Sequence, residues 1–375
     1  MMSGLYTFLM GNVVTFILVL SLLVFVHEMG HYLVGRWSGI RILAFSVGFG
    51  PEIFGFNDRH GTRWKISAIP LGGYVRFFGD EDASSKPDSE KVAAMSEEDR
   101  ARSFAGAKLW KRAATVAAGP IANFLLAIAI FAILFSVYGR MIADPVVAEV
   151  TPGGAAAAAG ILPGDLLVAI DGSKVETFDD VRRYVAIRPS QKIVVTVERG
   201  GQKLDVPMVP QRTDRTDQFG NKIELGQIGI VTNKEAGNFR LRNYTPLEAV
   251  REGVIESAGI VTGTFKYIAN IFAGSMRADQ LGGPIRVAQA SGQMASLGIG
   301  AVLQLAATLS VSIGLLNLMP VPVLDGGHLM FYAVEAVRGR PLGAKAQEIA
   351  FRIGLAMILT LMVFTTWNDI SLSSG

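Results

Sequence analysis

The chain has 375 residues, of which 50% are hydrophobic and 18% are charged, and its mean hydropathy is +0.38. Soluble globular proteins carry about 25% charged residues, and here the apolar residues are gathered into long runs, so the composition indicates a protein of the lipid bilayer. The formal net charge is +3 without a dense tract of Lys and Arg, and nucleic acid is therefore not expected as a partner. The absence of cysteine excludes disulfides and cysteine-based zinc or iron–sulfur sites.

Four runs are long and apolar enough to cross a hydrocarbon layer of about 30 Å. They are Leu5–Val26, Ala113–Tyr138, Leu297–Leu324 and Ile349–Trp367, the last with Arg352 near its start. We predict one transmembrane helix from each run, within residues 1–36, 113–138, 297–333 and 349–368. The first run has neither a basic segment nor a small-residue cleavage site, so we interpret it as a span and not as a signal peptide.

Basic residues gather at the ends of the predicted spans on one side. They flank the segment between spans one and two and occupy the connection between spans three and four: Arg36, Arg41, Lys108, Lys111, Arg112, Arg338, Arg340 and Lys345. Because Lys and Arg near the ends of spans favour the cytoplasmic side, both segments are predicted to be cytoplasmic. Both chain termini and the long segment 140–296 are then predicted to lie outside.

The first span ends in the motif His27-Glu28-x-x-His31. Positions i and i+4 of an α-helix share a face, so both histidines can bind one metal ion, and Glu28 beside them can accept a proton from water. The alternative is that the span ends at Val26 and the three polar side chains are only solvated at the interface. An ionised side chain inside a span costs about 2.5–3.5 kcal/mol on insertion, which favours a functional site.

Two histidines leave a catalytic zinc site one protein ligand short, since such sites usually have three. The stretch from Asn317 to His328 contains Pro320, Pro322 and then Asp325, the first carboxylate after the third apolar run. The charge bias and the run lengths place Asp325 at the same cytoplasmic depth as the histidine motif. Non-helical backbone at that depth is tolerated only inside protein or beside water, so this stretch is predicted to line a wet cavity. We predict Asp325 as the third ligand, with His328 as its rival or as a side chain that orients it.

The second span contains Gly119-Pro120-Ile121-Ala122-Asn123 within an uncharged run. One interpretation is a helix kink with a hydrogen bond between helices. The other is a direct role for Asn123 in the active site, and the sequence leaves both open.

At these residues the chain resembles the site-2 protease family (M50 type) of intramembrane zinc metalloproteases, and within it the bacterial regulator-of-sigma-E type. The matching segments are HEMGH at 27–31, GPIAN at 119–123, NLMPVPVLDGGH at 317–328 and a PDZ-like stretch at 160–172. The resemblance covers nearly the whole chain in the same order. A well-known enterobacterial member has two PDZ domains, whereas the segment here holds one.

The resemblance implies a Zn²⁺ ion held at the positions of His27, His31 and Asp325, with Glu28 catalytic. Further positions are implied to hold the substrate or the developing oxyanion: Asn317, Asn123, Pro320 and Pro322. It also implies regulated proteolysis of single-span membrane proteins, such as an anti-sigma factor after a first outside cut, or of signal-peptide remnants. The expected location is the bacterial inner membrane, with the active site toward the cytoplasm.

Residues 37–112 are predicted to hold a β-hairpin on the cytoplasmic side, with strands at 64–69 and 74–78 around a turn at 70–73. The hairpin is either a small structural sheet or an exposed edge that pairs with an extended substrate, and the resemblance favours the second. The polar, charged stretch at 80–102 predicts a mobile loop.

Residues 146–210 are predicted to form an extracytoplasmic PDZ-like α+β domain. Such a domain either accepts peptide ends by strand addition or acts as a size filter. Residues 211–296 are predicted as a polar connector with interfacial helices, one of them at 247–276, where charged and apolar residues are mixed.

Two other classes of membrane protein fit the sequence less well. A zinc transporter would need ionisable groups along a pathway, and here they lie at one depth. A PDZ scaffold without catalysis would not need Glu28. The sequence therefore predicts a polytopic α-helical membrane protein of about four transmembrane helices that acts as a zinc metalloendopeptidase.

Overall fold

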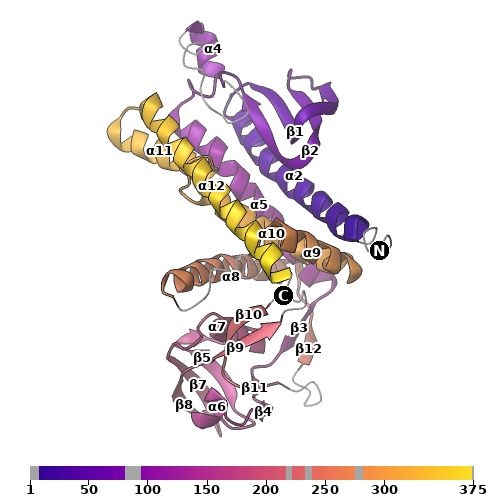
Figure 1. Ribbon diagram of the computed structural model, residues 1–375, viewed down its shortest axis with the longest axis vertical. Helices are drawn as coiled ribbons and strands as arrows, with labels where there is room; N and C mark the ends of the chain where they lie inside the picture. Colours follow the sequence, from indigo (N-terminus) through magenta and orange to yellow (C-terminus); the bar gives the residue numbers. More distant parts are fainter. Residues whose placement is uncertain (1–7, 81–93, 217–221, 233–238, 275–281, 374–375) are drawn as a thin grey trace. The chain divides into compact units, whose positions relative to one another are not determined.

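The computed structural model describes residues 8–80, 94–216, 222–232, 239–274 and 282–373. The chain divides into two compact units (Figure 1), one built from residues 1–131 and 283–366 and the other from residues 132–282 and 367–375. Each is described by itself below.

Helices dominate the first unit. Their bounds are Val14–Trp37 (α2, after the π-helical turn η1, Phe8–Val13), Glu97–Arg102 (α4), Leu109–Val137 (α5), Pro284–Ser296 (α9), Ile299–Leu318 (α10), Asp325–Arg338 (α11) and Ala344–Ser373 (α12). Four of the described helices are long and apolar enough to span a membrane, over residues 11–37, 109–137, 299–318 and 345–371. These are the four spans expected from the apolar runs.

Two glycines bring helices into close contact with α5. A Cβ added at Gly30 of α2 would lie 2.3 Å from the Ala118 carbonyl oxygen, and one at Gly314 of α10 would lie 3.1 Å from that of Pro120. In lipid the hydrophobic effect does not bring helices together, so they associate through close backbone contact, which small residues permit. Both α2 and α10 therefore pack on the same short stretch of α5.

The first unit also contains a sheet of two long, bent strands, Ile42–Asn57 (β1) and Arg63–Phe77 (β2), beside α2 (Figure 1). Residues 44–47 of β1 have register partners in both halves of β2, at 63–66 and at 73–76. The predicted strands at 64–69 and 74–78 therefore do not pair with each other, because β1 lies between them. The connecting turn is at 58–62 and not at 70–73. Gly72, with φ of 113°, lets β2 bend where a turn was expected.

The turn between β1 and β2 is tied to α2 through Asp58. Its carboxylate accepts hydrogen bonds from Tyr32 Oη at 2.9 Å and from Trp64 Nε1 at 3.1 Å, and it lies 3.5 Å from the Arg36 guanidinium. Burial raises the pKa of Asp58, but hydrogen bonds from Thr62, Trp64, Tyr32 and His60 outweigh it and lower the pKa to about 2. The Asp58 carboxyl group is therefore ionised at any ordinary pH.

The predicted loop at 80–102 is partly helical. Residues 97–102 form α4, whose first turn carries three carboxylates and whose N-cap, Ser96, accepts a hydrogen bond from the Asp99 N–H. Residues 81–93 of that prediction lie outside the described residues.

The second unit is an α+β domain followed by a long helix. Its strands are Arg140–Ala143 (β3), Glu149–Val150 (β4), Leu166–Ile170 (β5), Ser173–Lys174 (β6), Ile193–Arg199 (β7), Gln202–Met208 (β8), Gln211–Thr216 (β9), Lys222–Gln227 (β10), Ile230–Val231 (β11) and Phe239–Arg242 (β12), and its helices are Ala155–Ala158 (α6), Phe178–Ala186 (α7) and Pro246–Phe272 (α8). The central sheet has the order β6-β5-β7-β8 and is antiparallel.

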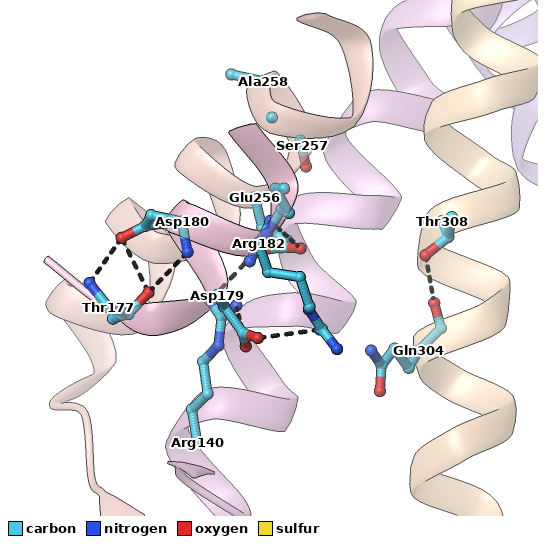
Figure 2. Close-up of polar contacts among 12 residues, drawn as sticks. Arg140, Thr177, Asp179, Asp180, Arg182, Glu256, Ser257, Ala258, Gln304 and Thr308 are labelled. Atoms are coloured by element: carbon cyan, nitrogen blue, oxygen red, sulfur yellow. Dashed lines mark hydrogen bonds and ion pairs between the residues drawn. The ribbon is translucent and has the colours of Figure 1, made fainter. Parts of the chain in front are cut away.

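The core of this domain follows from the period of its strands. Ile193, Val195 and Val197 of β7 alternate with more exposed residues and are fully buried in one apolar cluster. Helix α7 packs on that cluster through Val181 and Val185 and begins with a capping box, in which Thr177 and Asp180 bond each other's backbone N–H groups (Figure 2).

Residues 211–244, expected to be a polar connector, form strands β9 to β12. Two of these complete sheets begun earlier in the chain, since β11 pairs with β4 and β12 pairs with β3. The domain therefore continues beyond Pro210. Strands β10 and β12 alternate apolar and polar residues over only four to six positions, which is a weak signal within an otherwise polar stretch.

Helix α8 occupies most of the predicted interfacial stretch at 247–276. Its buried residues Ala249, Gly253 and Ser257 share one face, while Leu247 is 83% exposed. Glu256 holds it to the domain with ion pairs to Arg140 at 3.2 Å and Arg183 at 3.0 Å. Figure 2 shows Glu256 beside α7. The helix is amphipathic.

A partly buried ion pair joins α5 to α11 in the first unit. Both nitrogens of the Arg112 fork donate to Glu335, at 3.2 and 2.5 Å, each side chain is 15% exposed, and the guanidinium lies 5.1 Å from the centre of the Tyr332 ring. Removing one member of a buried pair leaves the other charge uncompensated, which costs about 3–5 kcal/mol.

Because this pair is only partly buried, Arg112→Leu should lower the free energy of unfolding by less than that, about 1.5–3 kcal/mol, and the double variant with Glu335→Leu should recover most of the loss. Unfolding of the detergent-solubilised protein by heat or denaturant measures both. Equal stability of the single and double variants would mean that the pair is not electrostatically coupled.

Candidate metal centre

Two histidine rings project from one face of α2. His27 and His31 are one turn apart and buried, and their Nε2 atoms lie 3.2 Å from each other. Both rings rest against Gly119 of α5, where an added Cβ would lie 2.3 Å from His31 Nε2 and 2.9 Å from His27 Cε1. Glycine at this position therefore gives the two rings their space.

Asp325 approaches the same point as the first residue of α11. Its Oδ2 atom lies 3.1 Å from His27 Nε2 and 3.5 Å from His31 Nε2, and the helix N-terminus favours a carboxylate there. The reversal that leads into α11 needs small residues. A Cβ at Gly326 would lie 2.3 Å from the Met319 carbonyl oxygen, and one at Gly327 would lie 2.5 Å from that of Val321.

The three side chains fit a metal ion. They form the one group of three candidate ligands within the described ranges, with ligand atoms all within 4.8 Å of one another. Zinc–nitrogen and zinc–oxygen bonds of about 2.0–2.1 Å in a tetrahedron separate the ligand atoms by about 3.3 Å, and the separations here are 3.1, 3.2 and 3.5 Å. Asp325 Oδ2 is also buried without a regular hydrogen bond from any described residue, as a ligand oxygen would be.

Helix α5 orients both imidazoles through contacts to their Nδ1 atoms. The Thr115 carbonyl oxygen lies 2.8 Å from His31 Nδ1, and because a carbonyl only accepts, Nδ1 carries the proton and leaves the Nε2 lone pair directed at the ion site. The Asn123 amide lies 3.2 Å from His27 Nδ1.

Glu28 lies next to this group without being one of its ligands. It is 9% exposed and faces a cavity of about 200 Å³ that His27, His31 and Asp325 also line. The second half of β2 forms one wall, and its backbone approaches so closely that a Cβ at Gly73 would lie 3.1 Å from Glu28 Cγ. The cavity is lined by His27, Glu28, His31, Gly73, Tyr74, Val75, Phe77, Val116, Asn317, Val323, Leu324, Asp325 and His328.

The other expected site residues fall into two groups. Asn317 and His328 line the cavity, and the His328 ring lies 5.4 Å from the ring of Phe351 and outside the three-ligand group. Asn123 is fully buried behind His27 and does not line the cavity. Pro320 and Pro322 are also absent from its lining and lie in the bend between α10 and α11.

Sequence reasoning did not find Thr115 or Gly73. Thr115 acts through its carbonyl, which every residue type possesses, so no sequence signal marks it. Gly73 stands beside Gly72 between apolar residues, a pattern that was interpreted as a turn although it marks a close approach of the backbone.

Comparison with known proteins agrees with this geometry. A model of peptidase family M50 matches residues 15–361. The chain is 73% identical to "Putative zinc metalloprotease Atu1380" of Agrobacterium fabrum over 97% of each chain. It is 68% identical to "Putative zinc metalloprotease R01501" of Rhizobium meliloti over 99% of each, and 38% identical to Metalloprotease MmpA of Caulobacter vibrioides over 96% of this chain and 95% of that one. The chain belongs to peptidase family M50.

As a member of this site-2 protease family, the protein is a zinc-dependent metalloprotease. Its four long apolar helices make it a membrane protein. The expected enzyme class, metal and family are thereby confirmed.

Gly119→Ala should weaken zinc binding, because the new methyl group would displace both histidine rings. The loss should be no smaller than the about 10–100-fold that follows removal of a residue that orients a ligand. Zinc content after equilibration with a chelator measures this. Gly300→Ala in α10 is the matched control, since a Cβ there meets nothing within 4 Å. Wild-type zinc affinity in Gly119→Ala would mean that the rings do not rest against α5.

Proposed function

We propose that this M50 peptidase is an intramembrane endopeptidase that cuts single-span membrane proteins, with His27, His31 and Asp325 holding zinc and Glu28 acting as the base. The observation that carries the proposal is the position of Glu28. It shares one cavity with the three-ligand group, and the walls of that cavity come from apolar helices long enough to span a membrane.

The chemistry divides between the metal and the chain. Zinc, when bound, supplies Lewis acidity that polarises a carbonyl group and makes water acidic near neutral pH. Glu28 accepts the proton of the attacking water and delivers it to the leaving amine. Burial of Glu28 keeps this exchange away from bulk water. Asn317, which offers an amide to the same cavity, is proposed to hold the substrate or the developing oxyanion.

The substrate is proposed to enter as an extended segment. The carbonyls of a helix are engaged in hydrogen bonds and shielded, so a helical span must unwind before attack. The stretch 73–77 of β2 lines the cavity and pairs with β1, its one strand partner among the described residues. Its other edge is a surface on which an extended chain can add as a strand. Pro320 and Pro322 would keep the opposite wall free of regular helix.

Basic residues at the ends of the spans support a cytoplasmic position for the active site and an outside position for both termini. We place the enzyme in the bacterial inner membrane. The proposed substrates are an anti-sigma factor already cut once outside, or a signal-peptide remnant, and the process would then be regulated intramembrane proteolysis.

We propose a PDZ-like role for the domain of the second unit. It has a cavity of about 190 Å³ between α7 and residues 225–230, with Val181, Val185 and Ile228 among its lining residues. Such a groove suits an extended peptide end. The alternative is a size filter that binds no peptide, and a peptide-binding measurement on the full-length enzyme distinguishes the two.

Glu28→Gln should abolish cleavage, by at least about 10²–10⁴-fold, and leave zinc bound, because Glu28 moves protons and does not ligate the metal. The assay is mass spectrometry of a co-expressed single-span substrate, with metal analysis of the purified variant. Persistent cleavage would refute the proposed role, and joint loss of zinc and activity would make Glu28 structural.

Asp325→Asn should reduce zinc content and cleavage together, since a neutral amide is a poor replacement for a carboxylate ligand. His328→Ala should keep its zinc and lose less activity, because His328 lies outside the three-ligand group. Metal content and cleavage rate of the two variants, measured side by side, test this. The opposite ranking would identify His328 as the third ligand.

A further inference from the structure

We infer that Asn123 is a positioning residue whose side-chain amide supplies the acceptor that His27 Nδ1–H needs when that ring binds zinc. This deepens the proposed function and rests on it only in assuming that His27 is a ligand. The contact on which it depends joins the Asn123 amide to His27 Nδ1, the ring nitrogen on the side away from Asp325.

The two imidazoles are fixed by different kinds of partner. His31 Nδ1 meets the Thr115 carbonyl, which can only accept a hydrogen bond. His27 Nδ1 meets a side-chain amide, which can accept through Oδ1 or donate through Nδ2. The tautomer of His31 is therefore set by the backbone, whereas that of His27 depends on residue 123 and can be changed by substitution.

The buried amide has one unused atom. Asn123 is fully buried, its Nδ2 lies 3.2 Å from His27 Nδ1, and its Oδ1 is buried without a hydrogen bond from any described residue. Its backbone is held in place, since Ser310 Oγ donates to the Asn123 carbonyl at 2.8 Å. A buried polar atom without a partner costs about 1–3 kcal/mol, and a single hydrogen bond to His27 leaves one end of this amide in that state whichever way it is turned.

Metal binding decides which end of the Asn123 amide meets His27. A histidine that binds a metal through Nε2 carries its proton on Nδ1, and that N–H needs an acceptor. A half-turn of the Asn123 amide exchanges two atoms of nearly equal size and directs Oδ1 at Nδ1. Oδ1 then accepts from Nδ1–H while Nδ2 takes the position that Oδ1 held, so the exchange loses no hydrogen bond and no other part of the chain has to move.

The amide also satisfies the other tautomer. With Nδ2 directed at Nδ1, His27 carries its proton on Nε2, which lies 3.1 Å from Asp325 Oδ2 and can donate to it. Asparagine therefore serves His27 in both forms, while aspartate, an acceptor only, would serve the metal-binding form alone. This difference provides the test.

The experiment compares Asn123→Leu and Asn123→Asp in the full-length, detergent-solubilised protein. Zinc affinity is measured by competition with a chelator. Asn123→Leu, which has no acceptor, should bind zinc about 10–100-fold more weakly. Asn123→Asp should match or exceed the wild type. Asn317→Leu is the matched control, because it makes the same change in the cavity wall without contacting a ligand, and it should keep wild-type zinc affinity.

A second measurement follows the tautomer directly. The chain has four histidines, so ¹⁵N-histidine labelling yields four imidazoles, and variants at His60 and His328 assign two of them. The measurement is made on the zinc-free protein, because zinc bound at Nε2 would itself fix the proton of His27 on Nδ1. There Asn123→Asp should hold that proton on Nδ1, and the wild type should populate the same form. In Asn123→Leu, the share of that form should fall.

Two results would overturn the inference. One is Asn123→Asp binding zinc as weakly as Asn123→Leu, which would make the role one of packing. The other is an unchanged His27 tautomer in Asn123→Leu. Should that variant fail to accumulate, Asn123→Ala replaces it. Neither readout involves proteolysis, so a failure of the proposed function would appear separately, in Glu28→Gln.

Discussion

The close packing of α2 and α10 on residues 115–123 of α5 is the constraint on which the site depends. Gly30 and Gly314 permit the contacts, and Gly119 then leaves space for two imidazoles between α2 and α5. In a membrane no hydrophobic force between helices brings about such an approach, so backbone contact and buried hydrogen bonds must stabilise it. The Thr115 and Asn123 hydrogen bonds are therefore part of the helix packing and of the metal site at once.

The proposed third ligand, Asp325, depends on a different feature, a break in the chain between α10 and α11. Met319 to Leu324 are not helical, and Val323 has a φ of 101°, a left-handed value that is rare for a β-branched residue. Broken backbone leaves polar groups that lipid cannot satisfy. The break is tolerated because it adjoins the cavity and packs against neighbouring helices, and it lets α11 begin with its first carboxylate at the histidines.

The spans and the side-chain motifs could be predicted because each has its own sequence signal. Long apolar runs, three of them uncharged, marked the four helices, and the i, i+4 spacing of His27 and His31 placed both rings on one face of α2. Asp325 was found because it was the first carboxylate after a span. The arrangement of the sheet could not be predicted, since residues 44–47 lie between two stretches that looked like one hairpin. Pairing between distant segments is set by tertiary packing, and the local pattern of residues carries no information about it. The role of Asn123 stayed open because its partner is 96 residues away.

The tie between Asp58 and α2 has a consequence for where a substrate is cut. It joins the β1–β2 turn to Tyr32, one residue beyond His31, through a carboxylate that stays charged. The distance between the edge of β2 and Glu28, the proposed base, is therefore kept constant. Successive residues of a strand face opposite sides, so sliding by one residue would turn every side chain over. A chain added to this edge would present its peptide bonds to Glu28 in steps of two residues, and alternate residues would decide which bond is broken.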